Sequence, residues 1–178
     1  MVNANLSIKY AKAFFNLYGA QLELADFWLI KKAATILAKN RAVLDLFNLH
    51  SEVEQLNLNR VFLKYFKLPE SFSKLLTMLQ KHKRTFLLPD ILSEISELCL
   101  SYNRQLFFKL TAYPALSEVE IGQVIDYLEK NTNKQILYEY YQDQNLIAGF
   151  KMQSRQFLYE DTIKCRLQKI HRKLVRQN

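Results

Sequence analysis

Glycine and proline are scarce in this chain, whose 178 residues contain only three of each. Few sharp reversals are therefore possible, which favours long helices over a many-stranded sandwich. The glycines, Gly19, Gly122 and Gly149, are isolated from one another. Phosphate-binding loops need clustered glycines, because backbone amides reach phosphate only where side chains leave room. Neither a P-loop nor a dinucleotide-binding fingerprint is present, so we expect no nucleotide cofactor.

Metal-ligand spacing is also missing. The two cysteines, Cys99 and Cys165, lie far apart among apolar neighbours on predicted helices. That setting is typical of small buried side chains in a reducing compartment. The histidines, His50, His82 and His171, have no ligand-like spacing with the cysteines or with one another. We therefore expect no disulfide framework and no metal site.

Membrane-spanning segments are not predicted either. No apolar run approaches the roughly 18 residues that a bilayer span needs, and no signal-peptide pattern opens the chain. Hydrophobic residues make up 49% of the sequence, enough to bury a real core. We expect a soluble protein whose association with a membrane, if any, runs through a partner.

Two carboxylate pairs, Glu118 with Glu120 and Glu160 with Asp161, are the only groupings that suggest acid–base chemistry. Both pairs lie at the start of a predicted helix, where acidic side chains cap the helix or interact favourably with its dipole. No nucleophile motif accompanies them. We expect no catalytic residue and a protein that is not an enzyme.

The net charge of +8 raises nucleic acid, anionic lipid and acidic protein as partners. One basic cluster spans residues 81–84, and the other crowds the final predicted helix: Lys164, Arg166, Lys169, Arg172, Lys173 and Arg176. That helix is the best nucleic-acid candidate, since phosphate contacts need clustered cations. The apolar stripe of this helix is uninterrupted, which instead favours binding to a protein surface. A basic nucleic-acid-binding or scaffold adaptor is the alternative to the function below.

Apolar residues at helical spacing predict six helices in residues 1–104. The first has apolar residues on two sides, which indicates deep burial or a groove for another helix: Leu6, Tyr10, Ala13, Phe14 and Leu17, widened by Ala11, Phe15 and Tyr18. Asn40 is expected to cap a third helix at about residues 41–48. Ser51 with Glu54 forms a capping-box pattern for the fourth, and Pro69 is expected to start the fifth.

The period changes to two after residue 104, which predicts a strand over residues 106–112. Ser117 and Glu120 form a second capping box, and residues 135–141 are rich enough in β-branched and aromatic side chains to be another strand. A hairpin follows, with strands at 146–153 and 156–160 about a reversal at 154–155. A basic amphipathic helix closes the chain. The predicted fold is α+β, mostly α: a six-helix bundle over residues 1–104 and a small α/β domain over residues 105–178.

The order of these parts resembles the delta/OSCP family of F-type ATP synthase subunits, and the resemblance covers nearly the whole chain. Four stretches carry it in register: Tyr10-Ala11-Lys12-Ala13, residues 75–89, Ala115-Leu116-Ser117-Glu118, and residues 143–174. The resemblance implies a non-catalytic stator component, present in one copy per complex, that couples proton transport to ATP synthesis. It also implies a peripheral location on the cytoplasmic face of a bacterial inner membrane.

The family also implies partners. Amino-terminal helices of the alpha subunits would lie between the first and fifth helices, on Tyr10, Ala13, Phe14, Leu75, Met78 and Leu79. The carboxy-terminal ends of the b subunits would contact the second domain, on Ile147, Phe150, Ile163, Leu167, Ile170 and Leu174. No cofactor, metal or nucleic acid is implied.

Three positions depart from the family pattern. Ala148 replaces the first of two glycines, and Arg155 replaces the hairpin glycine, which predicts a different hairpin turn. The Asp-Gly-Ser that leads into the last helix in the family is Glu160-Asp161-Thr162 here. Because Asp tolerates the left-handed backbone better than most residues, we expect that turn to be kept.

Overall fold

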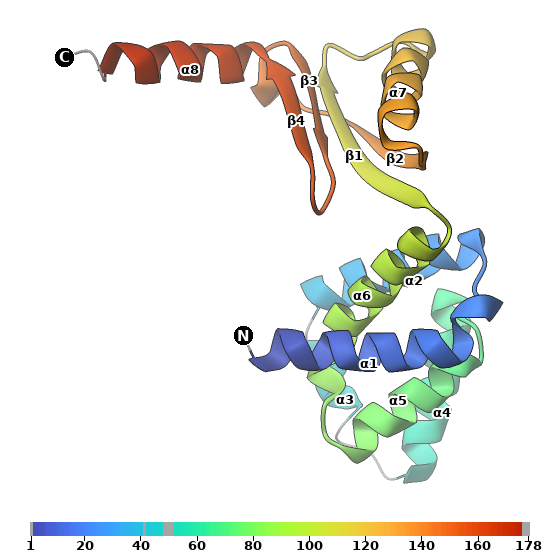
Figure 1. Cartoon of the computed structure of the whole chain (residues 1–178). Coiled ribbons are helices and arrows are strands. Elements are labelled where there is room, and N and C mark those ends of the chain that lie inside the picture. Colours follow the sequence, from blue (N-terminus) through green and yellow to red (C-terminus); the bar gives the residue numbers. More distant parts are fainter. Residues whose placement is uncertain (1, 41, 48–51, 176–178) are drawn as a thin grey trace. The chain divides into compact units, whose positions relative to one another are not determined.

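The structure is a computed structural model that describes residues 2–40, 42–47 and 52–175 (Figure 1). It divides into two compact units, unit 1 comprising Met1–Tyr102 and unit 2 comprising Asn103–Asn178. The division lies two residues before residue 104, where the spacing of apolar residues in the sequence changes from a helical to a strand period. Across the described residues the chain is mostly helical, with eight α-helices and one four-stranded sheet, which is an α+β architecture.

Helices are the only regular elements among the described residues of unit 1. Its elements are α1 (Val2–Tyr18), η1 (Gly19–Gln21), α2 (Leu24–Lys39), α3 (Ala42–Leu46), α4 (Glu52–Phe66), α5 (Ser71–Lys81), η2 (Thr85–Leu87) and α6 (Leu88–Tyr102). The central helix is α6, which packs against both α1 and α2, whereas α5 packs mainly against α4. Ile91, Leu92 and Ile95 of α6 are completely buried. This pattern follows from the apolar stripe of α6, which recurs every three to four residues.

One polar pair lies inside this apolar core. The side-chain amides of Asn59 on α4 and Gln80 on α5 donate to each other's oxygens at 3.0 and 2.9 Å. Both residues are buried. Because each amide satisfies the other, the pair avoids the cost of an unpaired buried polar group and aligns α5 on α4.

Two predicted helix starts differ from the structure. The side-chain amide of Asn40 donates to the carbonyl of Ile36 at 3.2 Å, so Asn40 caps the end of α2. The next helix, α3, is shorter than predicted. Pro69 lies two residues before α5, and its carbonyl accepts from the Phe72 amide at 3.1 Å. The predicted capping box at Ser51 lies outside the described residues.

Unit 2 is built on a sheet with the strand order β2-β1-β3-β4. Its elements are β1 (Gln105–Tyr113), α7 (Glu118–Thr132), β2 (Gln135–Gln142), η3 (Gln144–Leu146), β3 (Gly149–Gln153), β4 (Leu158–Thr162) and α8 (Ile163–Val175). β1 and β2 pair in parallel, so α7 is their crossover helix, and the other pairs are antiparallel. Ser117 and Glu120 form the predicted capping box at the start of α7.

The sheet has one buried face, and α7 covers it (Figure 1). Phe108, Leu110 and Ala112 alternate along β1 and are buried, together with Ile136 of β2 and Met152 of β3. Lys109, which lies between two of these residues, is exposed. Successive side chains of a strand point to opposite faces. The alternation in the sequence therefore correctly predicted the strand, and the structure shows which of its faces is buried.

The strand predicted at 146–153 begins three residues later, at Gly149, because the chain turns sharply before it. Ile147 has φ 68° and ψ −61°, and the Ala148 amide donates to the Leu146 carbonyl at 2.9 Å. This is a three-residue γ-turn of the less common hand. Gly149 follows with φ 105°, a backbone region that favours glycine.

The hairpin between β3 and β4 has a four-residue loop, residues 154–157. The Ser154 hydroxyl accepts from the amides of Gln156 and Phe157 at 3.3 and 2.9 Å, which holds the reversal. Arg155 has no left-handed backbone, in agreement with a turn unlike the family's glycine turn. The second strand begins at Leu158, two residues later than predicted.

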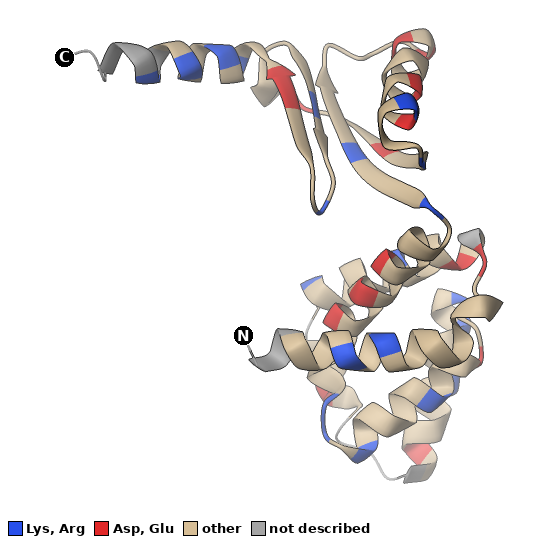
Figure 2. Ribbon diagram, viewed as in Figure 1, with Lys and Arg blue, Asp and Glu red and all other residues tan. Residues whose placement is uncertain are grey.

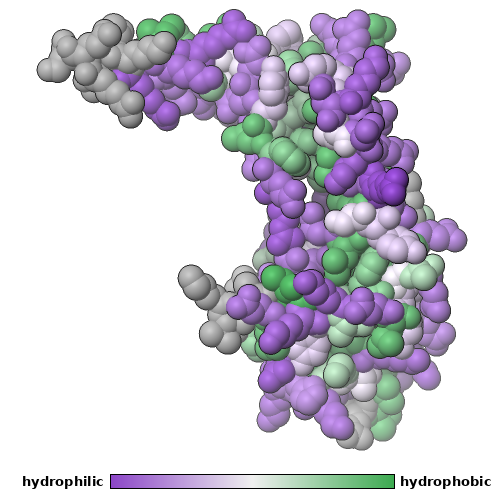
Figure 3. All heavy atoms as spheres, viewed as in Figure 1, coloured by the Kyte–Doolittle hydropathy of each residue, from purple (hydrophilic) through white to green (hydrophobic). Residues whose placement is uncertain are grey.

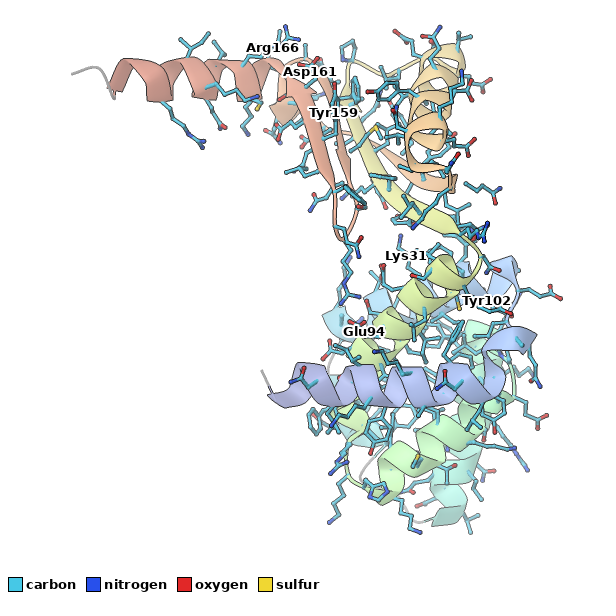
Figure 4. All side chains as sticks on the ribbon, viewed as in Figure 1. Lys31, Glu94, Tyr102, Tyr159, Asp161 and Arg166 are labelled. Carbon is cyan, nitrogen blue, oxygen red and sulfur yellow. The ribbon has the colours of Figure 1, made fainter. Side chains whose placement is uncertain are left out.

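The left-handed turn expected at Asp161 is not formed. Asp161 has no positive φ, because β4 runs directly into α8. The Thr162 hydroxyl accepts from the Cys165 amide at 3.1 Å and so caps this helix. The Asp161 carboxylate instead accepts three hydrogen bonds from Arg166, the shortest at 2.8 Å, and Figure 4 shows both side chains at the strand-to-helix junction.

Candidate functional site

An apolar groove of about 440 Å³ lies between α1 and α5 in unit 1. It exists because α1 rests on α6 while α5 rests on α4, so the two helices do not close on each other. The groove is lined by Leu6, Lys9, Tyr10, Ala13, Phe14, Leu17, Tyr18, Lys74, Leu75 and Met78. Hydrophobic residues reach the surface on the face of unit 1 that carries α1 (Figure 3).

The floor of the groove is buried and its rims are exposed. The rings of Phe14 and Phe72 pack with their centroids 4.6 Å apart, which joins α1 to α5 below the opening. Leu75 is buried beside them. Leu17 and Met78 are 73% and 51% exposed. Large apolar side chains on the rims of a formed groove are typical of a surface that another helix covers.

Five of the six residues predicted for the first interface line this groove. Tyr10, Ala13 and Phe14 do so from α1, and Leu75 and Met78 from α5. The sixth, Leu79, is 0% exposed and belongs to the core of unit 1. Leu79 follows Leu75 by four residues, so it continues the buried side of α5.

The groove also contains residues that the sequence prediction left out. Leu6 and Leu17 extend the stripe of Tyr10 and Ala13 by one turn at each end, a signal that was present in the helical spacing. Tyr18 contributes its ring, and Lys74 holds its ammonium nitrogen 5.5 Å from the centre of that ring. A periodic search for apolar residues overlooks lysines, because it does not count the apolar stem of a charged side chain.

Two separate apolar surfaces in unit 2 contain the residues predicted for the second interface. The first is the stripe on α8, where Ile163, Leu167 and Ile170 are 44%, 53% and 54% exposed. The remaining surface of this helix carries basic residues and no acidic ones (Figure 2). The side chain of Leu174 lies outside the described part of the chain. Ile147, in the turn before β3, is also exposed.

Phe150 lies in the other apolar surface, a groove of about 290 Å³ between α7 and the strands β3 and β4. Its ring stacks on Tyr159 with the centroids 5.7 Å apart, and Val124, Tyr127 and Met152 complete most of the lining. None of the described residues of α8 lines this groove. The structure therefore separates Phe150 from the α8 stripe with which the sequence had grouped it.

The described residues provide exposed apolar surfaces. No group of three or more His, Cys, Asp or Glu side chains in residues 2–40, 42–47 and 52–175 could hold a metal ion; His50 is outside this set. Burial raises the pKa of the Cys99 thiol to about 11, and Asp26 adds to the effect, so this thiol stays protonated at neutral pH. The Glu120 carboxylate accepts from the Ser117 backbone and hydroxyl, which lowers its pKa. It is engaged in capping α7.

A helical unit, a small mixed sheet and exposed apolar helix faces are typical of a protein that binds other proteins. Residues 6–174 match the family model described as "ATP synthase delta (OSCP) subunit". The chain belongs to this family, and it is a non-catalytic structural subunit of an ATP synthase that partners with other subunits of the complex. No helix in the described part of the chain combines the length and apolar character needed to cross a membrane.

Individual relatives agree with this assignment. The chain is 29% identical over 126 residues to the ATP synthase subunit delta of Pelagibacter ubique (strain HTCC1062), an alignment that covers 71% of this chain and 68% of the relative. It is 23% identical over 175 residues to the subunit delta of Trichlorobacter lovleyi, with 96% and 97% covered. Its fold is similar to a chain in the cryo-EM structure of the Toxoplasma gondii mitochondrial ATP synthase hexamer, with a TM-score of 0.67, 16% identity and coverage of 96% and 97%.

Proposed function

We propose that this chain is the peripheral-stalk subunit that ties the catalytic head of an ATP synthase to its membrane-anchored b subunits. In this role it lies on the cytoplasmic face of a bacterial inner membrane, in one copy per complex. It resists the torque that the rotating shaft exerts on the head, so that proton transport stays coupled to ATP synthesis. The joint has to be tight and static, which burial of a helix in an apolar groove provides.

The observation that carries this proposal is the open groove between α1 and α5. In the proposed complex, α1 to α6 act as one six-helix bundle, and the amino-terminal helix of an alpha subunit occupies the groove. It contacts Tyr10, Ala13, Phe14, Leu75 and Met78, all of which line the groove. Leu79 supports the groove from within the core. Ala13 has the smallest side chain of this set and lets the incoming backbone come close.

For the other end of the joint we propose the exposed surfaces of unit 2. The carboxy-terminal helix of a b subunit would cover the α8 stripe of Ile163, Leu167 and Ile170, with Leu174 in line one turn further along the sequence. The neighbouring Ile147 and the separate Phe150 groove extend the contact. Without a partner, the α8 stripe leaves apolar area in water, and covering it supplies about 25 cal/mol per Å².

The test uses a peptide that matches the amino-terminal helix of the alpha subunit from the same organism. We expect isothermal titration calorimetry to give a micromolar or tighter Kd, and Ala13→Trp to weaken binding at least about tenfold by filling the groove. Ala20→Trp is the matched control, because Ala20 is exposed and does not line the groove. Circular dichroism shows whether each variant remains folded. Absence of binding by the folded wild-type protein would overturn the proposal.

A further inference from the structure

Both walls of the groove in unit 1 carry positively charged side chains and no negatively charged ones. α1 carries Lys9 and Lys12, and α5 carries Lys74 and Lys81, and neither helix contains an aspartate or a glutamate. Figure 2 shows blue segments and no red ones on both helices. Other helices of the same unit are different, since α6 carries Asp90, Glu94 and Glu97. The absence of acidic residues is therefore a property of the groove walls.

Two of these lysines belong to the groove itself. Lys9 and Lys74 line it from opposite walls, and both are exposed. The side chain of Lys74 reaches toward α1, where its ammonium group lies over the Tyr18 ring. Lys12 is equally exposed on α1 but does not line the groove. An occupant thus meets Lys9 on one side of its apolar stripe and Lys74 on the other.

A third cation lies at the Tyr10 end of the groove. The Arg84 guanidinium donates to the Tyr10 hydroxyl oxygen at 2.9 Å, which leaves the phenolic hydrogen free to be donated to an incoming acceptor. Tyr10 and Tyr18 are eight residues apart on α1, which is about 12 Å along the helix axis. Cationic groups therefore lie at both ends of a stretch of groove slightly longer than two helical turns.

We infer that the groove selects an amphipathic helix with carboxylates on both flanks of its apolar stripe, placed about two turns apart. This inference rests on the proposed function, because it specifies which chemistry the alpha-subunit helix brings to the groove. The apolar floor supplies most of the binding free energy, and the three cations discriminate between helices of similar hydrophobicity. Lys9, Lys74 and Arg84 are then the residues that determine specificity.

The experiment compares two synthetic amphipathic peptides with an identical apolar stripe, one with Glu and one with Lys at the flanking positions. We expect the wild-type protein to bind the Glu-flanked peptide about tenfold more tightly, since each exposed pair contributes modestly and each like-charge contact opposes binding. The double variant Lys9→Glu/Lys74→Glu should reverse this preference. Lys12→Glu, which changes a charge on the same helix outside the groove, should keep it.

Salt dependence gives a second readout that needs no variant. The preference for the Glu-flanked peptide should shrink between about 0.01 M and about 1 M salt, over which the screening length falls from about 30 Å to about 3 Å. Equal binding of both peptides would overturn the inference, as would an equal loss of preference in Lys12→Glu. A preference for anionic phosphatidylglycerol vesicles over both peptides would also overturn it.

The outcomes separate this inference from the proposed function. If the alpha-subunit peptide binds and Ala13→Trp weakens it, but flanking charges have no effect, only the charge selection fails. If the Glu-flanked peptide binds selectively while the alpha-subunit peptide does not bind, the proposed partner fails and the charge selection stands.

Discussion

Gly149 of β3 lies close to the backbone of β4, where it pairs with Thr162. A Cβ atom there would lie 2.1 Å from the Asp161 carbonyl oxygen and 2.9 Å from the Thr162 Cα, and the residue has φ 105°. Backbone atoms cannot move aside without breaking the pairing of β3 with β4. The family's second glycine is thus required at this position, whereas Ala148 is accommodated in place of the first.

We predict that Gly149→Ala destabilises unit 2 by about 2–3 kcal/mol, the usual cost of a strained backbone conformation plus displacement of β4. Urea unfolding followed by circular dichroism measures this. Gly122→Ala is the control: a Cβ there meets nothing within 4 Å, and alanine in a helix interior should add about 0.5–1 kcal/mol. A Gly149→Ala protein as stable as the wild type would contradict this account of the close approach.

The two cysteines should differ in reactivity. Cys99 is 3% exposed and its pKa is raised to about 11, chiefly by burial, while Cys165 is partly exposed. At pH 8 we expect a thiol-labelling reagent to modify Cys165 quickly and Cys99 only after unfolding, since the thiolate is the reactive form. The Cys165→Ser variant isolates the slow thiol. Equal rates for both thiols in the folded protein would contradict the burial of Cys99.

The raised pKa of Cys99 also predicts how the free energy of unfolding depends on pH. An unfolded thiol ionises near pH 9, whereas folded Cys99 stays protonated until about pH 11. The folded state therefore binds more protons between these values. The Cys99 contribution to stability is complete below pH 9 and is lost as the pH rises toward 11. The loss should be smaller in Cys99→Ala, measured against the wild type by urea unfolding at pH 8 and pH 10.

At the scale of single elements, α8 is the helix whose apolar stripe has no cover among the described residues. Leu167 is exposed, so Leu167→Glu should change the melting temperature of the free protein little, as surface substitutions stay within about 0.5 kcal/mol. The same change should weaken binding of a b-subunit carboxy-terminal peptide about tenfold or more, because burial of a leucine is worth about 1.5–3 kcal/mol. Calorimetry and thermal melts measure the two effects.

The comparison for Leu167→Glu is Leu110→Ala, which changes a buried leucine in β1. Leu110 is fully buried beneath α7, so the substitution should cost about 2–5 kcal/mol of stability. If Leu167→Glu lowered the stability of the free protein to the same extent, α8 would be packed on its own unit, and the proposed b-subunit surface would be wrong.

Helices and strands with strong periodicity were predictable as elements. The stripes of α1, α5 and α6 and the alternation in β1 each place apolar residues on one side, and that pattern has one stable arrangement. The boundaries of these elements near turns could not be predicted from the sequence. Asn40 and Pro69 fit two positions equally well in sequence, and the choice depended on which backbone groups were left without partners when the helices packed.

At the scale of the whole molecule, the groove between α1 and α5, which we propose binds the alpha-subunit helix, is lined by residues of unit 1. We therefore predict that a fragment of residues 1–102 unfolds cooperatively and binds the alpha-subunit peptide with a Kd within about twofold of the full chain. The fragment of residues 103–178 is the control and should bind only the b-subunit peptide. Failure of folded residues 1–102 to bind would show that the groove needs unit 2.

The sequence by itself determined the class of fold, the place where helical period gives way to strand period, and five of the six residues assigned to the groove. The fold class and the change of period follow from local spacing, because side chains on one face of an element must share one environment, whereas the groove residues were implied by the family resemblance. Only the tertiary structure decided that Leu79 is core, that Phe150 is separate from the α8 stripe, and that Lys9 and Lys74 line one groove while Arg84 bonds to the Tyr10 hydroxyl. Such neighbours come from different helices and strands, and their meeting depends on how whole elements pack.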